Sequence, residues 1–205
     1  MQRIYKTKNM ILPIVAYGDP VLKKTGESIT KDYPNLKALI DNMYETMEGA
    51  LGVGLAAPQI GLPIRLFIVD TSPFSEDDVF TPEEQEELKN FKRTFINAKI
   101  IKEEGEEWAF NEGCLSIPDV REDVFRQPLV TMEYEDENFK KHTETFDGLI
   151  ARVIQHEYDH IDGILFTDKL SALKKRLIKG KLTNISKGKI SVDYRMRFPN
   201  QKKKR

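Results

Sequence analysis

The chain has 205 residues, of which 40% are hydrophobic and 32% charged, and its formal net charge is -1. This balance excludes a wholly disordered chain and predicts a single globular domain. Because no apolar run is long enough to span a membrane and no secretory signal is evident, we expect a cytoplasmic protein that does not bind a membrane. The net charge names no partner, and we expect no binding to DNA. The only cysteine, Cys114, excludes an internal disulfide.

The first half of the chain predicts one helix and one buried strand. Residues 1–9 are expected to form a polar, basic leader that we exclude from the fold, and residues 10–180 are expected to form the folded domain. Apolar residues recur at helical spacing over 34–47, and 64–69 is a short apolar run typical of a buried strand. The acidic stretch 72–92 indicates a surface insertion, a solvated loop with one helical turn after Pro82.

The second half predicts most of the sheet and a central helix. Segments 95–102, 106–110, 129–135 and 141–146 resemble strands of a mixed or antiparallel sheet. Asp147 is positioned to cap a helix that begins at Gly148. A last amphipathic helix carries Leu170, Leu173 and Leu177, and residues 181–205 are expected to form a basic tail. The fold class predicted is α+β, with mixed or antiparallel sheets packed around a central metal-binding helix.

Two histidines in the central helix predict a metal site. His156 and His160 are four residues apart, so on a helix they share one face and can bind a single divalent ion. Glu157 between them is placed to move protons for a water bound to that ion. The alternative is that the two are surface histidines with no common role. The chain has only three histidines, and two of them lie at this spacing around a glutamate, so we favour the metal site.

A catalytic site of this kind needs a third protein ligand. No glutamate follows Glu157, and Phe166 occupies the position where a metzincin has its third histidine, so neither protease pattern is complete. The upstream candidates are His142, in a lysine-rich segment, and Cys114, in an apolar segment beside a glycine. We favour Cys114, although a lone cysteine is often only a small buried apolar residue.

The glycine-rich segment 52–61 contains a formal match to a dinucleotide-binding fingerprint. The fingerprint needs a strand before it and a helix after it, whereas here a helix comes first and Pro58, Gly61 and Pro63 prevent a second one. The glycines could instead let a substrate backbone approach closely, and the Gln59 amide could donate to a developing oxyanion. A tight structural turn with a satisfied glutamine remains the alternative.

Three segments together resemble one known family. They are Gly-Val-Gly-Leu-Ala-Ala-Pro-Gln at 52–59, Glu-Gly-Cys-Leu-Ser at 112–116 and Gln-His-Glu-Tyr-Asp-His at 155–160. In this order and over about residues 10–180, the chain resembles peptide deformylase. The resemblance implies removal of the formyl group from the N-terminal formylmethionine of newly synthesised polypeptides.

The resemblance also implies a role for particular residues. Cys114, His156 and His160 would bind one divalent ion, typically Fe(II), with Zn(II), Ni(II) or Co(II) able to occupy the site. Glu157 would be the general base and then the general acid. Gln59 and the backbone N–H of Leu115 would hold the oxyanion. The substrate main chain would contact residues of the first two motifs: Val53, Gly54 and Gly113.

Three rival functions remain at this stage. A metallopeptidase would share the histidine pair but cut internal bonds of unformylated peptides. A cysteine hydrolase using Cys114 with His156 would stay active without metal. A catalytically silent ribosome-binding module would depend on the basic C-terminal part, where residues 169–205 carry 14 Lys or Arg and one Asp. We also expect this part of an active enzyme to contact ribosomal RNA.

Overall fold

The computed structural model describes residues 10–200, and the predicted leader at 1–9 lies outside them. Its main sheet has the strand order β2-β3-β4-β7-β8, and every neighbouring pair is antiparallel. Four of these strands fall where hydrophobic patterning predicts them: β7 and β8 have the predicted bounds, and β3 and β4 differ from them by one to three residues at each end. The five strands are β2 (Gly54–Ala56), β3 (Leu66–Asp70), β4 (Lys92–Glu104), β7 (Leu129–Glu135) and β8 (Lys141–Phe146).

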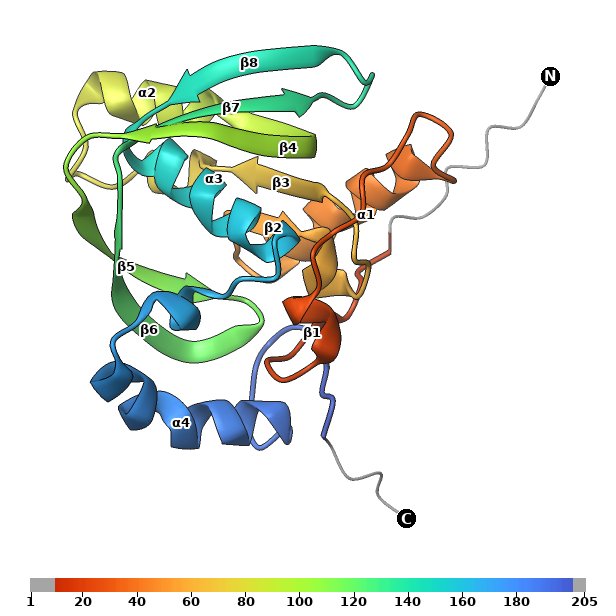
Figure 1. Ribbon diagram of the computed structural model, residues 1–205, viewed down its shortest axis with the longest axis vertical. Coiled ribbons are helices and arrows are strands. Elements are labelled where there is room, and N and C mark those ends of the chain that lie inside the picture. The colour runs from red at the N-terminus through yellow and green to blue at the C-terminus, as the bar shows by residue number, and fades with distance from the viewer. Residues whose placement is uncertain (1–9, 201–205) are drawn as a thin grey trace.

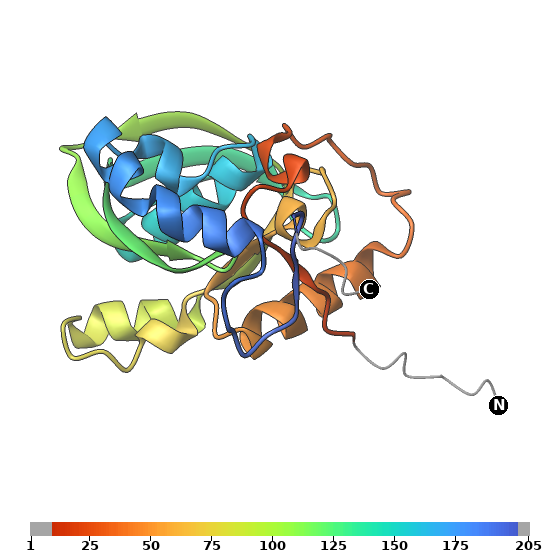
Figure 2. The same ribbon diagram turned by 90° about the horizontal axis from the view of Figure 1, so that it is seen from below.

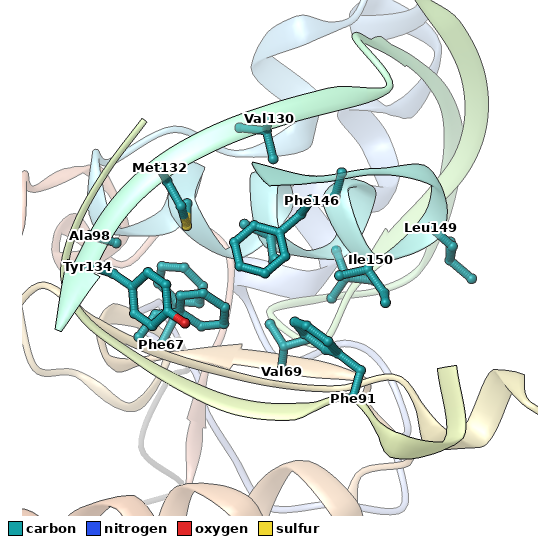
Figure 3. Close-up of a cluster of buried hydrophobic side chains, with 14 of the residues drawn as sticks. Phe67, Val69, Phe91, Ala98, Val130, Met132, Tyr134, Phe146, Leu149 and Ile150 are labelled. Atoms are coloured by element: carbon teal, nitrogen blue, oxygen red, sulfur yellow. The ribbon is translucent and has the colours of Figure 1, made fainter. Parts of the chain in front are cut away.

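Helix α3 (Gly148–Ile161) lies in the centre of the molecule, between the main sheet and the β5–β6 hairpin (Figure 1). Twelve of its residues are buried. Its apolar side packs on the sheet, where Ile150 lies beside Phe146, Val69 and Phe91 in a common core (Figure 3). Burial from both sides gives the helix little freedom to shift, so its polar residues are held in fixed positions. The expected α+β class with a central helix is confirmed.

The opposite face of the sheet is covered by helix α1 (Leu36–Gly49). Strand β3 is buried on both faces, because Phe67 and Val69 pack toward α3 while Leu66 and Ile68 pack with the apolar side of α1. This explains why the strand appears in the sequence as a continuous apolar run rather than an alternating one.

A second, two-stranded unit consists of β5 (Trp108–Cys114) and β6 (Ile117–Arg126), which pair antiparallel. Strand β6 was not predicted. Its burial alternates only in part, and charged residues such as Arg121 and Glu122 interrupt the apolar positions. Helix α4 (Ala172–Ser186) packs on this hairpin, on the side away from α3 (Figure 1).

The acidic insertion is more ordered than predicted. A 3-10 turn, η3 (Ser72–Phe74), leads to helix α2 (Pro82–Asn90), whose nine residues replace the single turn that we expected. Thr81 caps it, accepting a hydrogen bond from the Glu84 N–H while the Glu84 carboxylate accepts one from the Thr81 N–H. This reciprocal capping stabilises a helix in which only Leu88 is buried. Figure 2 shows α2 projecting from the body of the molecule.

Two details of the predicted helices were wrong. Helix α3 does begin at Gly148, but the Asp147 side chain accepts no hydrogen bond from its first turn. Of the three leucines predicted for the apolar face of the last helix, Leu170 is buried but precedes the helix, while Leu173 and Leu177 are 65% and 72% exposed. The buried side carries Ile178, Leu182 and Ile185 instead.

The boundary expected at residue 181 falls inside α4, so the C-terminal part is not a separate tail. After the helix the chain returns to the domain, and β9 (Met196–Arg197) pairs in parallel with β1 (Ile14–Val15). Residues 201–205 of the predicted tail lie outside the described residues. Within 10–200, none of the helices has the length and apolar character needed to cross a membrane.

Candidate active site

The three predicted metal ligands come together although 42 residues separate Cys114 from His156 in the sequence. Cys114 is the last residue of β5, while His156 and His160 lie one turn apart on the face of α3 turned toward the hairpin. Their candidate ligand atoms all lie within 4.8 Å of one another, and the Cys114 Sγ is 3.3 Å from the His160 Nε2.

This donor set fits a divalent transition metal. Ligand atoms that surround one ion at about 2.0–2.3 Å in tetrahedral geometry lie roughly 3.5 Å apart, close to the observed Sγ–Nε2 distance. A thiolate with two imidazoles leaves a coordination position open, as catalytic sites require. The rejected candidate, His142, lies on β8, and its Nε2 is 3.0 Å from the Asp136 Oδ2, so it belongs to a different part of the surface.

Glu112 holds the first histidine in place. It precedes Cys114 by two residues on β5, so both side chains point to the same face of the strand. Its Oε2 lies 2.9 Å from the His156 Nδ1, which leaves the Nε2 of that ring for the metal. The carboxylate is in turn held by Arg126, at 2.7 and 3.0 Å, and by Arg152 at 3.2 Å.

These charges form a network that is almost completely buried. Arg126 also bonds to the Asp159 Oδ2 at 2.7 Å, so one guanidinium connects the hairpin to α3. Burial alone would raise the pKa of Glu112, but its hydrogen bonds with His156 and Arg126 outweigh burial and hold that pKa well below its usual range. The network therefore stays ionised and fixes the His156 ring.

Glu157 has the surroundings of a proton-transfer group. Its side chain is buried and its Oε2 has no hydrogen-bond partner among the described residues. Burial raises the pKa of Glu157 to about 7, despite the opposing charge of His156. A carboxyl group with a pKa near neutral can both accept and donate a proton under physiological conditions.

The two histidines differ in their electrostatics. Burial lowers the pKa of His160, and the neighbouring charge of His156 lowers it further. Burial opposes protonation of His156 too, but its contacts with Cys114 and Glu112 outweigh this and raise its pKa. His160 is thus a ready neutral ligand, whereas a metal that binds His156 displaces a proton.

Gln59 lies beside the ligand cluster, on the 3-10 turn η2 (Ala57–Ile60). Its Oε1 accepts a hydrogen bond of 2.8 Å from the Ala56 N–H, which turns the amide nitrogen toward the site. That nitrogen lies 3.4 Å from the Cys114 Sγ and 3.5 Å from the Ser116 Oγ. Leu115, whose backbone N–H was the other predicted donor, follows Cys114 in the tight turn between β5 and β6.

The glycine-rich segment lies directly against Glu157. A Cβ on Gly54 would lie 2.4 Å from the Glu157 Oε1, so only glycine leaves room for this carboxylate. Gly113 is similarly covered, since a Cβ there would lie 2.8 Å from the Arg121 guanidinium. Val53 lines the pocket next to Gly54.

All the predicted residues except His160 line one pocket of about 540 Å³, and His160 closes it from beneath through its contact with Cys114. Several residues that line this pocket were not predicted from the sequence. The insertion contributes Pro73 and Phe74, and the C-terminal segment contributes Tyr194. No local pattern could have indicated these, because each comes from a segment remote from the motifs. The further apolar lining comes from Leu51, Phe110, Ile117, Val120 and Val153.

Comparisons with known proteins agree with this geometry. The family model described as polypeptide deformylase matches residues 11–176. The peptide deformylase of Flavobacterium johnsoniae is 70% identical over 196 residues, which cover 96% of this chain and 100% of that protein. The one from Christiangramia forsetii is 68% identical, with the same coverage. Among solved structures, the peptide deformylase from Thermus thermophilus is similar with a TM-score of 0.73 and 38% identity, covering 86% of this chain and 98% of that one.

A central helix with two histidines around a glutamate, facing a cysteine that lines the same pocket, defines the class of metal-dependent hydrolases. The comparisons then specify the family. The chain belongs to the peptide deformylases, metalloenzymes that remove the N-formyl group from nascent polypeptides.

Proposed function

We propose that Cys114, His156 and His160 bind one divalent ion per chain, and that Fe(II) is the physiological metal. The observation that carries the proposal is the convergence of these three ligands, within 4.8 Å, on a pocket that also contains Glu157. Zn(II), Ni(II) and Co(II) suit the same sulfur and nitrogen donors. When bound, such an ion polarises a carbonyl oxygen and lowers the pKa of a bound water to about 7.

The residues of the chain then perform the proton transfers. We assign Glu157 as the base that accepts a proton from the attacking water and as the acid that returns it to the leaving amine nitrogen. Its pKa of about 7 supports both roles. The Gln59 amide and the Leu115 N–H are assigned as donors to the formyl oxygen as negative charge develops on it.

The remaining predicted residues bind the substrate. Val53, Gly54 and Gly113 lie on two segments that line the pocket, and we assign them as contacts of the peptide main chain. The apolar lining provided by Phe110 and Val153 suits the side chain of methionine. The substrate is therefore a formylated nascent peptide bound along the two segments, with its methionine side chain in the pocket.

The test is a formyl-Met peptide assay on protein prepared without oxygen, together with metal analysis. Glu157→Ala should retain one metal ion but lose most turnover, by about a hundredfold or more. The matched control is His142→Ala, because this histidine lies outside the ligand cluster and should be dispensable. A fully active Glu157→Ala variant would remove this residue from its role. Unchanged activity of wild-type protein after complete metal removal would overturn the metal assignment.

We further propose that the protein acts in the cytoplasm and contacts the ribosome through α4. This helix exposes Lys175, Arg176, Lys179 and Lys181, and its Leu173 and Leu177 are exposed beside them. A cationic surface of this kind favours binding to the RNA backbone. Because α4 packs on the hairpin, deleting it would damage the fold, so the test replaces side chains instead.

The measurement is co-sedimentation with ribosomes over a range of salt concentrations. Lys175→Ala with Lys179→Ala should weaken binding and reduce its dependence on salt. Lys140→Ala with Lys141→Ala removes the same charge from the exposed start of β8 and serves as the control. Equal binding by both double variants would refute the contact through α4.

A further inference from the structure

The C-terminal segment after α4 returns to the active site. In Figure 2 it loops away from α4 and comes back toward the N-terminal strand. Strand β9 pairs there with β1, and the Ile14 and Ala16 N–H groups donate to the Arg195 and Arg197 carbonyls at 2.8 and 2.9 Å. These backbone bonds fix Tyr194, the residue immediately before this pairing.

Tyr194 reaches from this segment to the turn that carries the cysteine. Its hydroxyl donates a hydrogen bond of 2.8 Å to the backbone carbonyl of Leu115, and its half-buried ring lines the pocket. Burial raises the pKa of Tyr194, so the hydroxyl keeps its proton and remains a donor.

The same turn is held from a second direction. The Tyr17 N–H, just after β1, donates to the Ser116 carbonyl at 2.8 Å. The β5–β6 pairing shifts register between Gly113 and Cys114 and ends at the pair of Cys114 with Ile117, so neither Leu115 nor Ser116 has a partner in the ladder. Instead, two hydrogen bonds hold the carbonyls of this turn. Tyr194, in the C-terminal segment, donates to the Leu115 carbonyl, and Tyr17, near the N-terminal strand, donates to the Ser116 carbonyl. The Leu115 side chain is also packed, since a Cβ on Gly52 would lie 2.7 Å from its Cδ1.

We propose that Tyr194 is a positioning residue for the deformylation reaction: by holding the Leu115 carbonyl it fixes the Leu115–Ser116 peptide, which limits rotation about the Leu115 Cα and so keeps the N–H of the preceding peptide, that of Leu115, aimed at the substrate oxygen. The inference rests on the proposed function, in which that N–H is an oxyanion donor. A donor contributes to catalysis only when its direction matches the developing charge, so a bond that restricts the Leu115 backbone increases turnover. The C-terminal segment is in this way part of the active site.

Tyr194→Phe is the direct test, because it removes the hydroxyl and keeps the ring that lines the pocket. With a formyl-Met peptide and the full-length metal-loaded protein, we expect kcat to fall about three- to tenfold, as for loss of a neutral hydrogen bond. KM should change less than about twofold, because the pocket wall is intact, and metal content should stay at the wild-type level. Exchange of the Leu115 and Ser116 amide protons should become faster than in wild type.

The matched control is Arg195→Ala. It also removes a side-chain hydrogen bond to a backbone carbonyl from this segment, that of the Arg195 Nη1 to the Ile11 carbonyl at 3.1 Å, but away from the pocket. It should leave kcat unchanged. The proposal is overturned if Tyr194→Phe has wild-type kcat, or if Arg195→Ala lowers kcat equally, which would indicate general loosening. Failure of the proposed function is distinguishable, since wild-type protein would then not show metal-dependent deformylation at all.

Discussion

The carboxylate of Glu157 packs against the backbone of Gly54 with no space between them. The hypothetical Cβ at this position lies within 2.7 Å of three atoms of the glutamate side chain. The sequence motif suggested a glycine that admits substrate backbone, and the structure adds a second reason for it. The absence of a side chain lets β2 approach α3 closely enough for Glu157 to reach the pocket.

Gly54→Ala should therefore displace the Glu157 carboxylate and lower kcat by about tenfold or more, since small misplacements of a catalytic group are costly. Metal content should be unchanged, because the atoms nearest to the added Cβ belong to Glu157 and not to a ligand. Steady-state kinetics and metal analysis measure both effects. Gly49→Ala is the control, as its Cβ meets only the Ile11 Cδ1, at 3.8 Å. Wild-type kcat for Gly54→Ala would show that the carboxylate has room to adjust.

Glu112 is a second residue whose expected role follows from its contacts in the structure, with Arg126, Arg152 and His156. Glu112→Gln removes a buried negative charge that Arg126 and Arg152 both require. We expect a loss of about 3 kcal/mol in the free energy of unfolding of the metal-free protein, and a decrease of about tenfold or more in metal affinity as His156 loses its orienting partner.

Urea unfolding and metal competition measure these two quantities. Glu122→Gln, which breaks the partly exposed pair of Glu122 with Lys174, should cost less than about 1 kcal/mol. Should both variants lose equal stability, the buried network has no special role.

At the scale of elements, the periodicity of apolar residues predicted the helices and strands that pack against the core. It did not predict elements with few buried residues. Helix α3 and strands β7 and β8 appear with their predicted starts, because apolar residues recur at helical spacing in α3 and the exposure of side chains alternates along both strands. Helix α2 buries one residue, so it has no apolar period to detect, and its capping box was the available but overlooked signal. For helix α4 the position was predicted correctly but the buried face was not. Leucines and isoleucines occur on both sides of the helix, and packing on the β5–β6 hairpin determines which side is buried.

The insertion before α2 contributes a side chain to the pocket, which its acidic composition did not indicate. Phe74, on η3, lines the pocket and packs against the main core. Phe74→Ala should raise KM for formyl-Met peptides about three- to tenfold, with a smaller effect on kcat, because apolar contact area with the bound peptide is lost.

Phe80→Ala is a close control for that variant. Phe80 belongs to the same insertion and packs on the same core, but it does not line the pocket. It should lower thermal stability without changing KM. A rise in KM of equal size in both variants would mean that Phe74 acts only by holding the insertion in place.

At the scale of the whole molecule, the sequence indicated the candidate metal ligands and base but not the residues that surround them in the pocket. The candidate ligands and base could be proposed from the sequence because residues four apart, such as His156 and His160, share one face of a helix, and because Cys114 was the better candidate for the third ligand. Tyr194 was not predictable, since its place depends on a β1–β9 pairing between segments about 180 residues apart. The position of the central helix, between a sheet and a hairpin, brings both kinds of residue to one pocket.

The account depends on one ion bound jointly by Cys114, His156 and His160, and X-ray absorption at the metal edge of the zinc-loaded protein tests this most directly. We predict one sulfur at about 2.3 Å and two imidazole nitrogens at about 2.0–2.1 Å from the ion. Cys114→Ala should abolish the sulfur contribution. A spectrum of wild-type protein that contains only nitrogen and oxygen neighbours would contradict the account.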